Sequence, residues 1–509
     1  MSSLRWTSRA TAADAAPRPI LVPLVVACAM FMQNLDSTVI ATALPTIARA
    51  LDESPLTLNV AITCYLLSLA VFIPISGWTA DRFGARRVFS AAIVVFTLGS
   101  IGCGMANSLA ALVAARIVQG MGGALMVPVG RLVLLRTVEK SDLVRAMSYV
   151  SVPALIGPVM GPPLGGFIVT YWSWRWIFFI NIPIGVLGIV LVNLLIGDLK
   201  EGGRRPFDVG GFALTGVGLA TLAFGFENVG RGALPSILVA VLLAVGAACT
   251  MLYVRHARRV AHPIIDLALF QIPTYAAASI GGFLFRMGLG ALPFLLPLML
   301  QVGFGLNALS SGLLTFASAA GAMTMKMTAA RIIRALGFRI VLVGDAVISA
   351  LFLFGYSLFR PTTPHLVIFL ALLAGGFFRS LQMTSINTLS YADVPPAMLS
   401  RATSLTSMAQ QLSQTVGVAT GALLLQVVLA LRGGGTLVAA DFYPAFVGVA
   451  MISLLSVPFF FKMSPDAGAE VSGRSVVRYP SVIAGQAERL LRAGKLAADQ
   501  PRIEPVAGQ

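Results

Sequence analysis

The chain has 509 residues, of which 57% are apolar and only 11% are charged. A soluble protein of this length carries about 25% charged residues, so most of this surface is expected to face lipid rather than water. The formal net charge of +16 is spread over short clusters between apolar runs, which argues against a nucleic-acid-binding surface and is typical of loops at a membrane face.

Apolar runs of about 20 residues recur along the chain, and each is long enough to cross a bilayer as a helix. Alternation of apolar and polar residues at period two is absent, which argues against a transmembrane β-barrel. The sequence therefore predicts an all-α polytopic membrane protein with fourteen transmembrane helices. Their expected ranges are 20–45, 56–79, 87–106, 109–135, 146–170, 175–197, 209–227, 234–254, 274–301, 307–328, 338–358, 365–388, 402–430 and 442–462.

Arginine and lysine are divided unevenly between the two sets of loops. With a cytoplasmic N-terminus, the inner loops carry sixteen of these residues and the outer loops carry five. Because positively charged loops stay on the cytoplasmic side, both termini are expected there, with the chain in the inner (cytoplasmic) membrane. The tails 1–19 and 463–509 are then cytoplasmic.

Two short stretches recur in the second part of the chain. The stretch "RFGARRVFSAAIVVF" (82–96) returns as "ALGFRIVLVGDAVIS" (335–349), an offset of 253 residues, and "VRAMSYVS" (144–151) returns as "SRATSLTS" (400–407), an offset of 256. We therefore expect an N-terminal six-helix half (20–197), an inserted helix pair with flanking loops (198–273) and a C-terminal six-helix half (274–462). Two matched halves are the construction of an alternating-access transporter, with the substrate site between them.

The first expected span contains an acid, Asp36, within "FMQNLDSTVIATALP" (31–45). A carboxylate inside a membrane costs a few kcal/mol or more unless it is neutralised or paired. Arg116, which opens "RIVQGMGGALMVP" (116–128) in the fourth expected span, lies at a similar depth and is the expected partner. Pairing favours the charged carboxylate and desolvation favours the neutral one, so a balanced pair can bind and release a proton. A static structural ion pair is the alternative.

The loop "GWTADRFGARRVF" (77–89) joins the second and third expected spans. Gly77 and Gly84 allow close packing and a tight turn at the membrane surface. Asp81 can face Arg82 and Arg86, or a nearby helix N-terminus, where an anion is favoured. We expect this loop to latch the two halves in one state; a solvated turn is the alternative.

The stretch "GPVMGPPLGGF" (157–167) lies in the fifth expected span. Glycine and proline at this density would ruin a soluble helix, but in a bilayer they make a kink and a smooth face for close packing. The residues concerned are Gly157, Gly161, Pro162, Gly165 and Gly166. A plain packing motif is the alternative.

Together these motifs resemble the major facilitator superfamily over nearly the whole chain. The GxxxDRxGxR loop, the RxxQGxG segment and the GxxxGPxxGG segment match the family's signatures, and the last is associated with antiporters. The stretches "LDSTVIATALP" (35–45) and "WSWRWIFFINIPIG" (172–185) resemble the first and sixth spans of its fourteen-span drug:proton antiporters of the EmrB/QacA type. The resemblance implies that Asp36 and Arg116 take part in proton coupling, with the proton gradient as the driving force and no cofactor.

By the same resemblance, the first and fourth helices of each half line the cavity. The candidate substrate residues there are Gln33, Asn34, Arg286, Arg379 and Gln382. An intramembrane charge is a functional candidate by default, and arginine suits carboxylates or phosphates. One acid against several arginines indicates a negatively charged substrate, such as an organic acid or a metal chelate of one. In the competing interpretation the arginines bond to backbone or glutamines, and the site accepts neutral or amphipathic drugs.

The leading hypothesis is a proton-coupled antiporter that exports drugs or other small amphipathic compounds as a monomer. An exporter of organic anions that uses Arg286 and Arg379, and a membrane sensor that transports nothing, are the alternatives. The sequence has no GxxxxGK[ST] loop for an ATP-driven pump, and its intramembrane polar residues make no catalytic or metal-binding set, so we expect neither an enzyme nor a metal site. Lys326 and Asp345, nearer the inner ends of their spans, are expected to be structural.

Overall fold

The fold is all-helical in the computed structural model, which describes residues 21–53, 55–197, 206–229, 234–434 and 437–472. Expectations for 1–19, 198–205 and the tail beyond 472 fall outside the described residues and stay predictions. The described part belongs to one compact unit that ends at Arg474.

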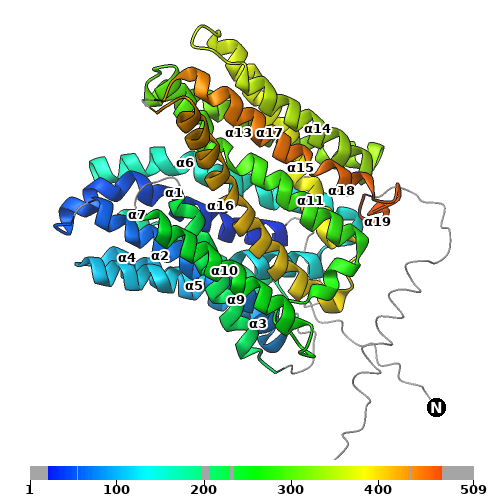
Figure 1. Cartoon of the computed structure of the whole chain (residues 1–509). Helices are drawn as coiled ribbons and strands as arrows, with labels where there is room; N and C mark the ends of the chain where they lie inside the picture. The colour runs from blue at the N-terminus through cyan, green and yellow to red at the C-terminus, as the bar shows by residue number, and fades with distance from the viewer. Residues whose placement is uncertain (1–20, 54, 198–205, 230–233, 435–436, 473–509) are drawn as a thin grey trace, which may run out of the picture. The chain divides into compact units, whose positions relative to one another are not determined.

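The helices follow one another in the order that the apolar runs predict (Figure 1). The first half comprises α1 (Leu21–Ala50), α2 (Pro55–Phe72), η1 (Ile73–Ile75), α3 (Ser76–Phe83), α4 (Ala85–Met105), α5 (Leu109–Thr137), η2 (Lys140–Asp142), α6 (Leu143–Tyr171), α7 (Trp176–Phe179) and α8 (Asn181–Leu195). The inserted pair is α9 (Val209–Asn228) and α10 (Ser236–Ala257), followed by η3 (Leu267–Gln271). The second half comprises α11 (Pro273–Gly290), α12 (Leu292–Leu298), η4 (Met299–Gly303), α13 (Ala308–Leu336), α14 (Phe338–Ser357), α15 (His365–Ala392), η5 (Pro396–Met398), α16 (Leu399–Leu431), η6 (Ala439–Asp441), α17 (Phe442–Leu454) and α18 (Val457–Phe461), and α19 (Ala469–Ser472) follows it.

Twelve segments of the described chain are long and apolar enough to cross a membrane. Helices α6 and α13 are not among these twelve, but they occupy the places of the fifth and tenth expected spans. The expectation of fourteen spans is therefore consistent with the structure, and the chain is a multi-pass membrane protein.

Several expected spans are interrupted or extended. The second, 56–79, consists of α2, the 3-10 turn η1 and α3, and Pro74 lies in that turn. The ninth, 274–301, consists of α11, α12 and the π-helical η4, with Pro297 two residues before η4 begins. Proline lacks the backbone N–H that continues the helical ladder of hydrogen bonds, and a proline lies in or beside each of these breaks. Helix α1 runs to Ala50 rather than to 45, so Asp36 lies near its middle.

The sequence repeat has a structural counterpart at two glycines. Gly84 precedes α4 with φ 91°, and Gly337 precedes α14 with φ 82°. Such a backbone conformation is strained for residues with a Cβ atom, and it turns the chain sharply from one helix into the next. The two copies of the repeat therefore share a turn as well as a sequence.

The expected inserted pair packs on both halves through α9. Helix α9 contacts α2 of the first half and α16 of the second. Asp208 caps α9 by accepting from the Gly211 N–H at 2.8 Å, and it also meets His256 Nε2 at 2.8 Å. Asp266, which follows α10, forms an ion pair with Arg401 of α16. The insert is thus fastened to the second half near the start of α16.

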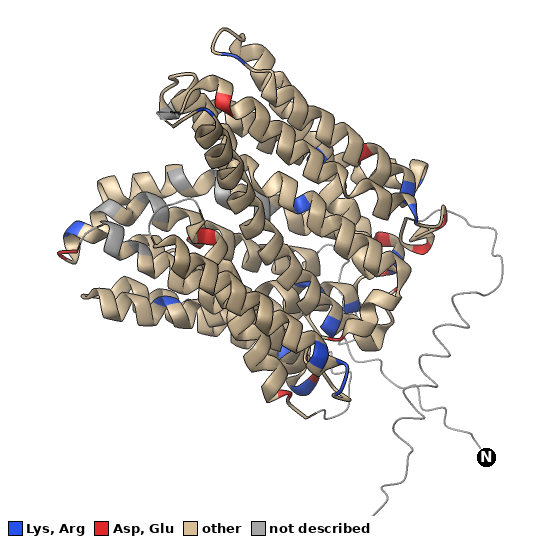
Figure 2. Cartoon of the chain, in the orientation of Figure 1, with Lys and Arg blue, Asp and Glu red and all other residues tan. Residues whose placement is uncertain are grey.

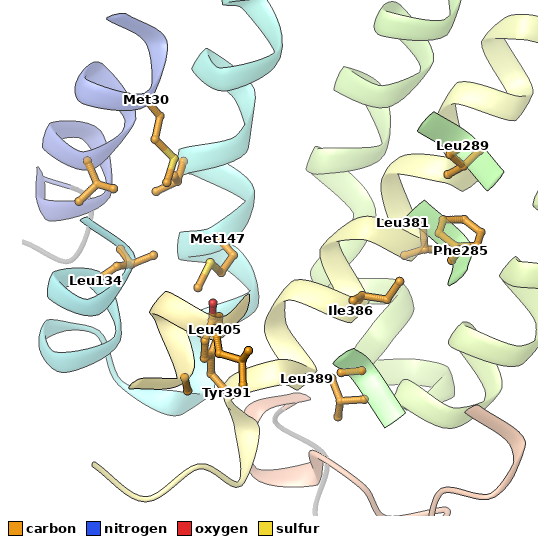
Figure 3. Close-up of a cluster of buried hydrophobic side chains, with 14 of the residues drawn as sticks. Met30, Leu134, Met147, Phe285, Leu289, Leu381, Ile386, Leu389, Tyr391 and Leu405 are labelled. Atoms are coloured by element: carbon orange, nitrogen blue, oxygen red, sulfur yellow. The ribbon is translucent and has the colours of Figure 1, made fainter. Parts of the chain in front are cut away.

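Most described Lys and Arg residues in Figure 2 lie at or near helix ends, with a large group around α3 and the end of α10. We call this the basic end; there α3 meets α4, α5 meets α6, α13 meets α14 and α15 meets α16. One buried apolar cluster includes residues of both halves and extends to this end. In Figure 3, Leu134 and Met147 of the first half lie beside Tyr391 and Leu405 of the second. Apolar packing therefore joins the halves at the basic end.

Candidate functional site

The two side chains that the sequence pairs in the membrane are in contact. Arg116 of α5 donates from Nη1 to Asp36 Oδ2 of α1 at 2.6 Å. Both side chains are fully shielded, with exposed fractions of 0% and 1%. A buried pair needs further hydrogen bonds to offset the loss of water, because Coulomb attraction alone does not cover the desolvation cost.

Those further bonds come from Gln119 on α5 itself and from two other helices, α4 and α8. Gln119, one turn after Arg116, donates to Asp36 Oδ1 at 2.8 Å and accepts from Arg116 at 2.6 Å. Asn181 at the start of α8 donates to the same Asp36 oxygen at 3.2 Å. Ser100 of α4 accepts from Gln119 at 2.7 Å and from Asn181 at 3.2 Å. We call these five residues the Asp36 cluster; all are buried.

The Asp36 cluster is rich in hydrogen-bond donors, and most of its polar atoms are paired with one another. Its carboxylate accepts three side-chain hydrogen bonds, one of them from a cation. The Arg116 guanidinium also lies over the Tyr65 ring, 4.2 Å from its centre, while its Nη2 is buried without a hydrogen-bond partner in the described chain. A proton added to Asp36 would turn one acceptor oxygen into a donor and break at least one of these bonds. Protonation of Asp36 would therefore disturb contacts among four helices.

The glycine motif of the fifth expected span lies directly behind the Asp36 cluster. A Cβ at Gly161 of α6 would lie 2.1 Å from Thr38 Oγ1, and one at Gly157 would lie 3.0 Å from Asn34 Cβ. Only residues without a side chain let α6 approach α1 so closely at the turns beside Asp36. Gly165 is buried, Gly166 has open space beside it, and the side chain of Pro162 is outside the described residues.

Two candidate cavity residues are adjacent to Asp36 but differ in their bonding. The Asn34 side chain donates to the Met30 carbonyl of its own helix at 2.9 Å. Gln33 has a buried Oε1 without a hydrogen-bond partner among the described residues. Gln33 therefore keeps a free acceptor for a donor that arrives from elsewhere.

The structure links Arg286 to Arg131, a contact between the halves that the sequence does not indicate. Arg286 of α11 donates to Asn387 Oδ1 of α15 at 2.8 Å, and Gln410 of α16 donates to the same oxygen at 2.7 Å. Gln410 accepts from Arg131 of α5 at 2.5 Å. Neither arginine meets a carboxylate in the described part of the chain. Two cations thus share a chain of neutral amides that crosses between the halves.

Arg379 and Gln382 have partners of a different kind. Arg379 of α15 donates to Ser318 Oγ of α13 at 2.9 Å. Gln382, one turn further along, donates to the Leu342 carbonyl of α14 at 3.0 Å. Both contacts lie within the second half, so the structure does not bring Arg379 into the chain that holds Arg286.

The loop expected to act as a latch does contact the second half. Asp81 accepts from Ser400 Oγ, in the first turn of α16, at 2.7 Å, and it meets Arg136 of α5 at 3.4 Å. Ser76 and Ser404 share a hydrogen bond of 2.7 Å. A Cβ at Gly77 would lie 2.7 Å from the Ser400 carbonyl oxygen. Of the two arrangements that the sequence allows for Asp81, the structure shows contact with the start of a helix.

Arg82 and Arg86 of this loop do not reach the second half through any hydrogen bond of the described residues. Arg82 is exposed at the surface. Arg86 donates to the backbone carbonyl of Asn193 at the end of α8, at 3.0 Å. The latch contacts in this conformation therefore come from Asp81, Ser76 and the close approach at Gly77.

Sequence reasoning missed three members of the Asp36 cluster. Gln119 stands three residues after Arg116, a spacing that puts both side chains on one helix face. This spacing could have predicted that Gln119 lies beside the pair. Ser100 and Asn181 are uncharged, and their spans carry no charge at that depth to draw attention to them. Only the three-dimensional arrangement places them beside Asp36. Arg131, Asn387 and Gln410 were visible as polar residues in apolar spans, but nothing in their spacing links them.

Comparisons with known proteins identify the family of the chain. The family model of the Major Facilitator Superfamily matches residues 26–418. Relatives named "Putative multidrug resistance protein MdtD" from Salmonella heidelberg (strain SL476) and Salmonella typhi are each 41% identical over 409 residues, which is 79% of this chain and 85% of theirs.

Two solved structures have a similar fold. The human organic anion transporter MFSD10 (TETRAN) has a TM-score of 0.62 at 16% identity, covering 87% of this chain and 100% of that one. The proton:xylose symporter XylE bound to 6-bromo-6-deoxy-D-glucose has a TM-score of 0.62 at 14% identity, covering 89% of this chain and 98% of that one. At such low identity the likeness concerns the fold alone.

Proposed function

The chain belongs to the major facilitator superfamily, and from this premise we propose that it is a proton-coupled antiporter that exports drugs or other small amphipathic compounds by alternating access. The observation that carries the proposal is the buried Asp36–Arg116 pair, completed by amide donors from Gln119 of α5 and Asn181 of α8. The name shared by the MdtD relatives supports drugs as the substrate class.

Proton binding and helix arrangement are linked at the Asp36 cluster. In this conformation the halves are joined at the basic end by Asp81–Ser400, Ser76–Ser404 and Arg131–Gln410. A proton that reaches Asp36 weakens its charge-assisted bond to Arg116 and loosens α1 from α5. The basic end then opens, substrate enters, and loss of the proton on that side restores the pair and closes it again. Each cycle exchanges protons for one substrate molecule.

Orientation and assembly complete the proposal. The basic end faces the cytoplasm, because arginine-rich loops are retained there, and both termini lie on that side of the cytoplasmic membrane. The two six-helix halves move against each other while the inserted pair α9–α10 stays on α2 and α16. The protein works as a monomer, and the proton gradient drives it without a cofactor.

The test uses proteoliposomes that hold purified protein and an imposed pH gradient. Internal pH is followed while ethidium as a cationic dye, neutral drugs and carboxylate chelates are added in turn to the wild type and to Asp36→Asn. We expect a proton flux triggered by one class of compound and its loss in the variant, because asparagine cannot carry a proton. Flux that is unchanged in Asp36→Asn would show a static ion pair, and no flux with any compound would favour a sensor.

A second candidate function is export of an organic anion or a metal–carboxylate chelate. The observation that favours it is Arg286, which is 3% exposed and bonded only to an amide among the described residues. Arginine that lacks a carboxylate partner is free to bind one from a substrate. Arg286→Gln and Arg379→Ala should then abolish export of carboxylates while export of neutral compounds continues. Equal loss of both would remove the anion hypothesis.

A further inference from the structure

The second half buries an acid that the proposed mechanism does not use. Asp345 of α14 is 3% exposed. Both of its carboxylate oxygens are buried, and neither accepts a hydrogen bond from the described residues. No described Lys or Arg lies within ion-pair distance of it. The backbone N–H of Gln382 lies near this carboxyl group but makes no well-formed hydrogen bond with it. An ionised carboxylate here has lost its water with no cation and no good donor in its place, which is strongly unfavourable.

Two more unpaired oxygens face the same surface of α14. Ser349 stands four residues after Asp345, on the same helix face, and its Oγ is buried without a partner in the described chain. Gln382 of α15 donates to the carbonyl of Leu342, three residues before Asp345, and its own Oε1 is buried and unpaired. The three side chains therefore present four unpaired oxygens and only one hydroxyl proton among them.

The charged groups on neighbouring helices are engaged elsewhere. Lys326 of α13 donates to Thr384 at 2.5 Å, and Arg379 of α15 donates to Ser318 at 2.9 Å. On α14 itself, Arg339 lies over the Phe461 ring, 5.0 Å from its centre. The other titratable or charged groups on α13, α14, α15 and α17 are Arg331, Arg334, Tyr356, His365, Tyr391 and Tyr443, and α18 carries none. None of those groups forms a hydrogen bond with Asp345 in the described structure.

The sequence repeat shows that packing alone does not require polar residues at this place. At the offset of 253 residues, the first half has Ala92 and Phe96 where the second has Asp345 and Ser349. Both of these apolar residues are buried in α4, with exposed fractions of 1% and 0%. The same helix position is therefore filled by an ordinary apolar core in one half and by an unpaired acid in the other.

We propose that Asp345, with Ser349 and Gln382, forms a second proton-binding site, which is loaded in this conformation. The added proton removes the unpaired negative charge and gives the site one donor, which can serve either Ser349 Oγ or Gln382 Oε1. Asp345 lies about 10 Å along α14 from its first residue at the basic end, so opening of that end hydrates the site and releases the proton there. The release step rests on the proposed antiport function; the loaded state does not.

The loaded state is tested by infrared spectroscopy of the full-length protein in lipid at neutral pH, with choline chloride as the only salt. We expect the carbonyl band of a protonated carboxylic acid, lost in Asp345→Asn and retained in Asp36→Asn. Gln382→Leu should shift the band, because it removes a hydrogen-bond acceptor from the acid. A spectrum unchanged by Asp345→Asn would overturn the proposal. Loss of the wild-type band when sodium replaces choline would also overturn it, by showing a metal-cation site.

Release is tested by counting protons moved per ethidium molecule in the proteoliposomes. Asp345→Asn, which has nearly the shape of the protonated acid, should keep ethidium export and move one proton fewer per molecule. An unchanged proton count together with the lost infrared band would overturn the release step and leave a neutral structural acid. Absence of ethidium flux in the wild type would count against the proposed function, while the infrared result would still decide the loaded state.

Discussion

Asp36 and Asp345, one buried acid in each half, are held by opposite means. Asp36 in α1 is matched by a cation and two amide donors, whereas Asp345 in α14 accepts no hydrogen bond from the described residues. The repeat does not relate the two acids, since its offsets of 253 and 256 place Leu289 and Leu292 opposite Asp36. Two halves of one fold can thus hold a buried carboxyl group either as a paired charge or as a neutral acid.

The largest expected effect comes from removing the cation of the Asp36 cluster. Arg116→Ala strands a buried carboxylate, and breaking a buried pair from one side costs about 3–5 kcal/mol. Arg379→Ala in the second half removes a cation whose hydrogen bond among the described residues is to Ser318, and should cost about 0.5–1.5 kcal/mol. Reversible unfolding in mixed micelles measures both variants against the wild type.

A double variant shows how much of the stability lost in Arg116→Ala comes from the unpaired carboxylate. Adding Asp36→Asn to Arg116→Ala removes the stranded charge, so part of the stability lost in the single variant should return. If Arg116→Ala and Arg379→Ala cost the same, or if the double variant recovers nothing, the contrast between a paired and an unpaired half is wrong.

The sequence gives the helices and the central pair more readily than their surroundings. Apolar runs locate the spans, and depth counted along two helices suffices to match Asp36 with Arg116. Asn181 could not be assigned because its contact depends on how α8 crosses α1, which apolar periodicity does not encode. The sequence suggests a structural role for Asp345 near the inner end of its span, and it does not show how deeply this side chain is buried, which depends on how α15 and α17 pack on α14.

An intermediate effect is expected where α6 seals the Asp36 cluster. Gly161→Ala places a Cβ 2.1 Å from Thr38 Oγ1, so α6 must move away from α1. Overpacking of this kind costs about 1–3 kcal/mol. Gly166→Ala on the same helix is the matched control, because nothing lies within 4 Å of the added carbon. The midpoint temperature of thermal unfolding is measured for both variants, and we expect it to fall further in Gly161→Ala. Equal midpoints would show that the α1–α6 contact is not tight.

The smallest effect is expected at the basic end, where the halves are joined by single polar contacts. Asp81→Asn weakens a charge-assisted hydrogen bond to Ser400 and the contact with Arg136. Ser400→Ala removes the hydrogen bond alone, which is worth about 0.5–1.5 kcal/mol. Both changes leave the Asp36 cluster intact, so they should shift the balance between conformations without unfolding the protein.

The shift can be measured as a distance at the opposite end of the molecule. Spin labels at Ala50 of α1 and Leu431 of α16, both exposed, report how far the halves are separated there. In an alternating mechanism, loosening the basic end favours closure of the far end, so the short-distance population should grow in Ser400→Ala and grow further in Asp81→Asn. Arg82→Ala is the control, because Arg82 is exposed and makes no described contact with the second half. A change of equal size in Arg82→Ala would mean that the loop acts through its charge rather than through the contact of Asp81 with α16.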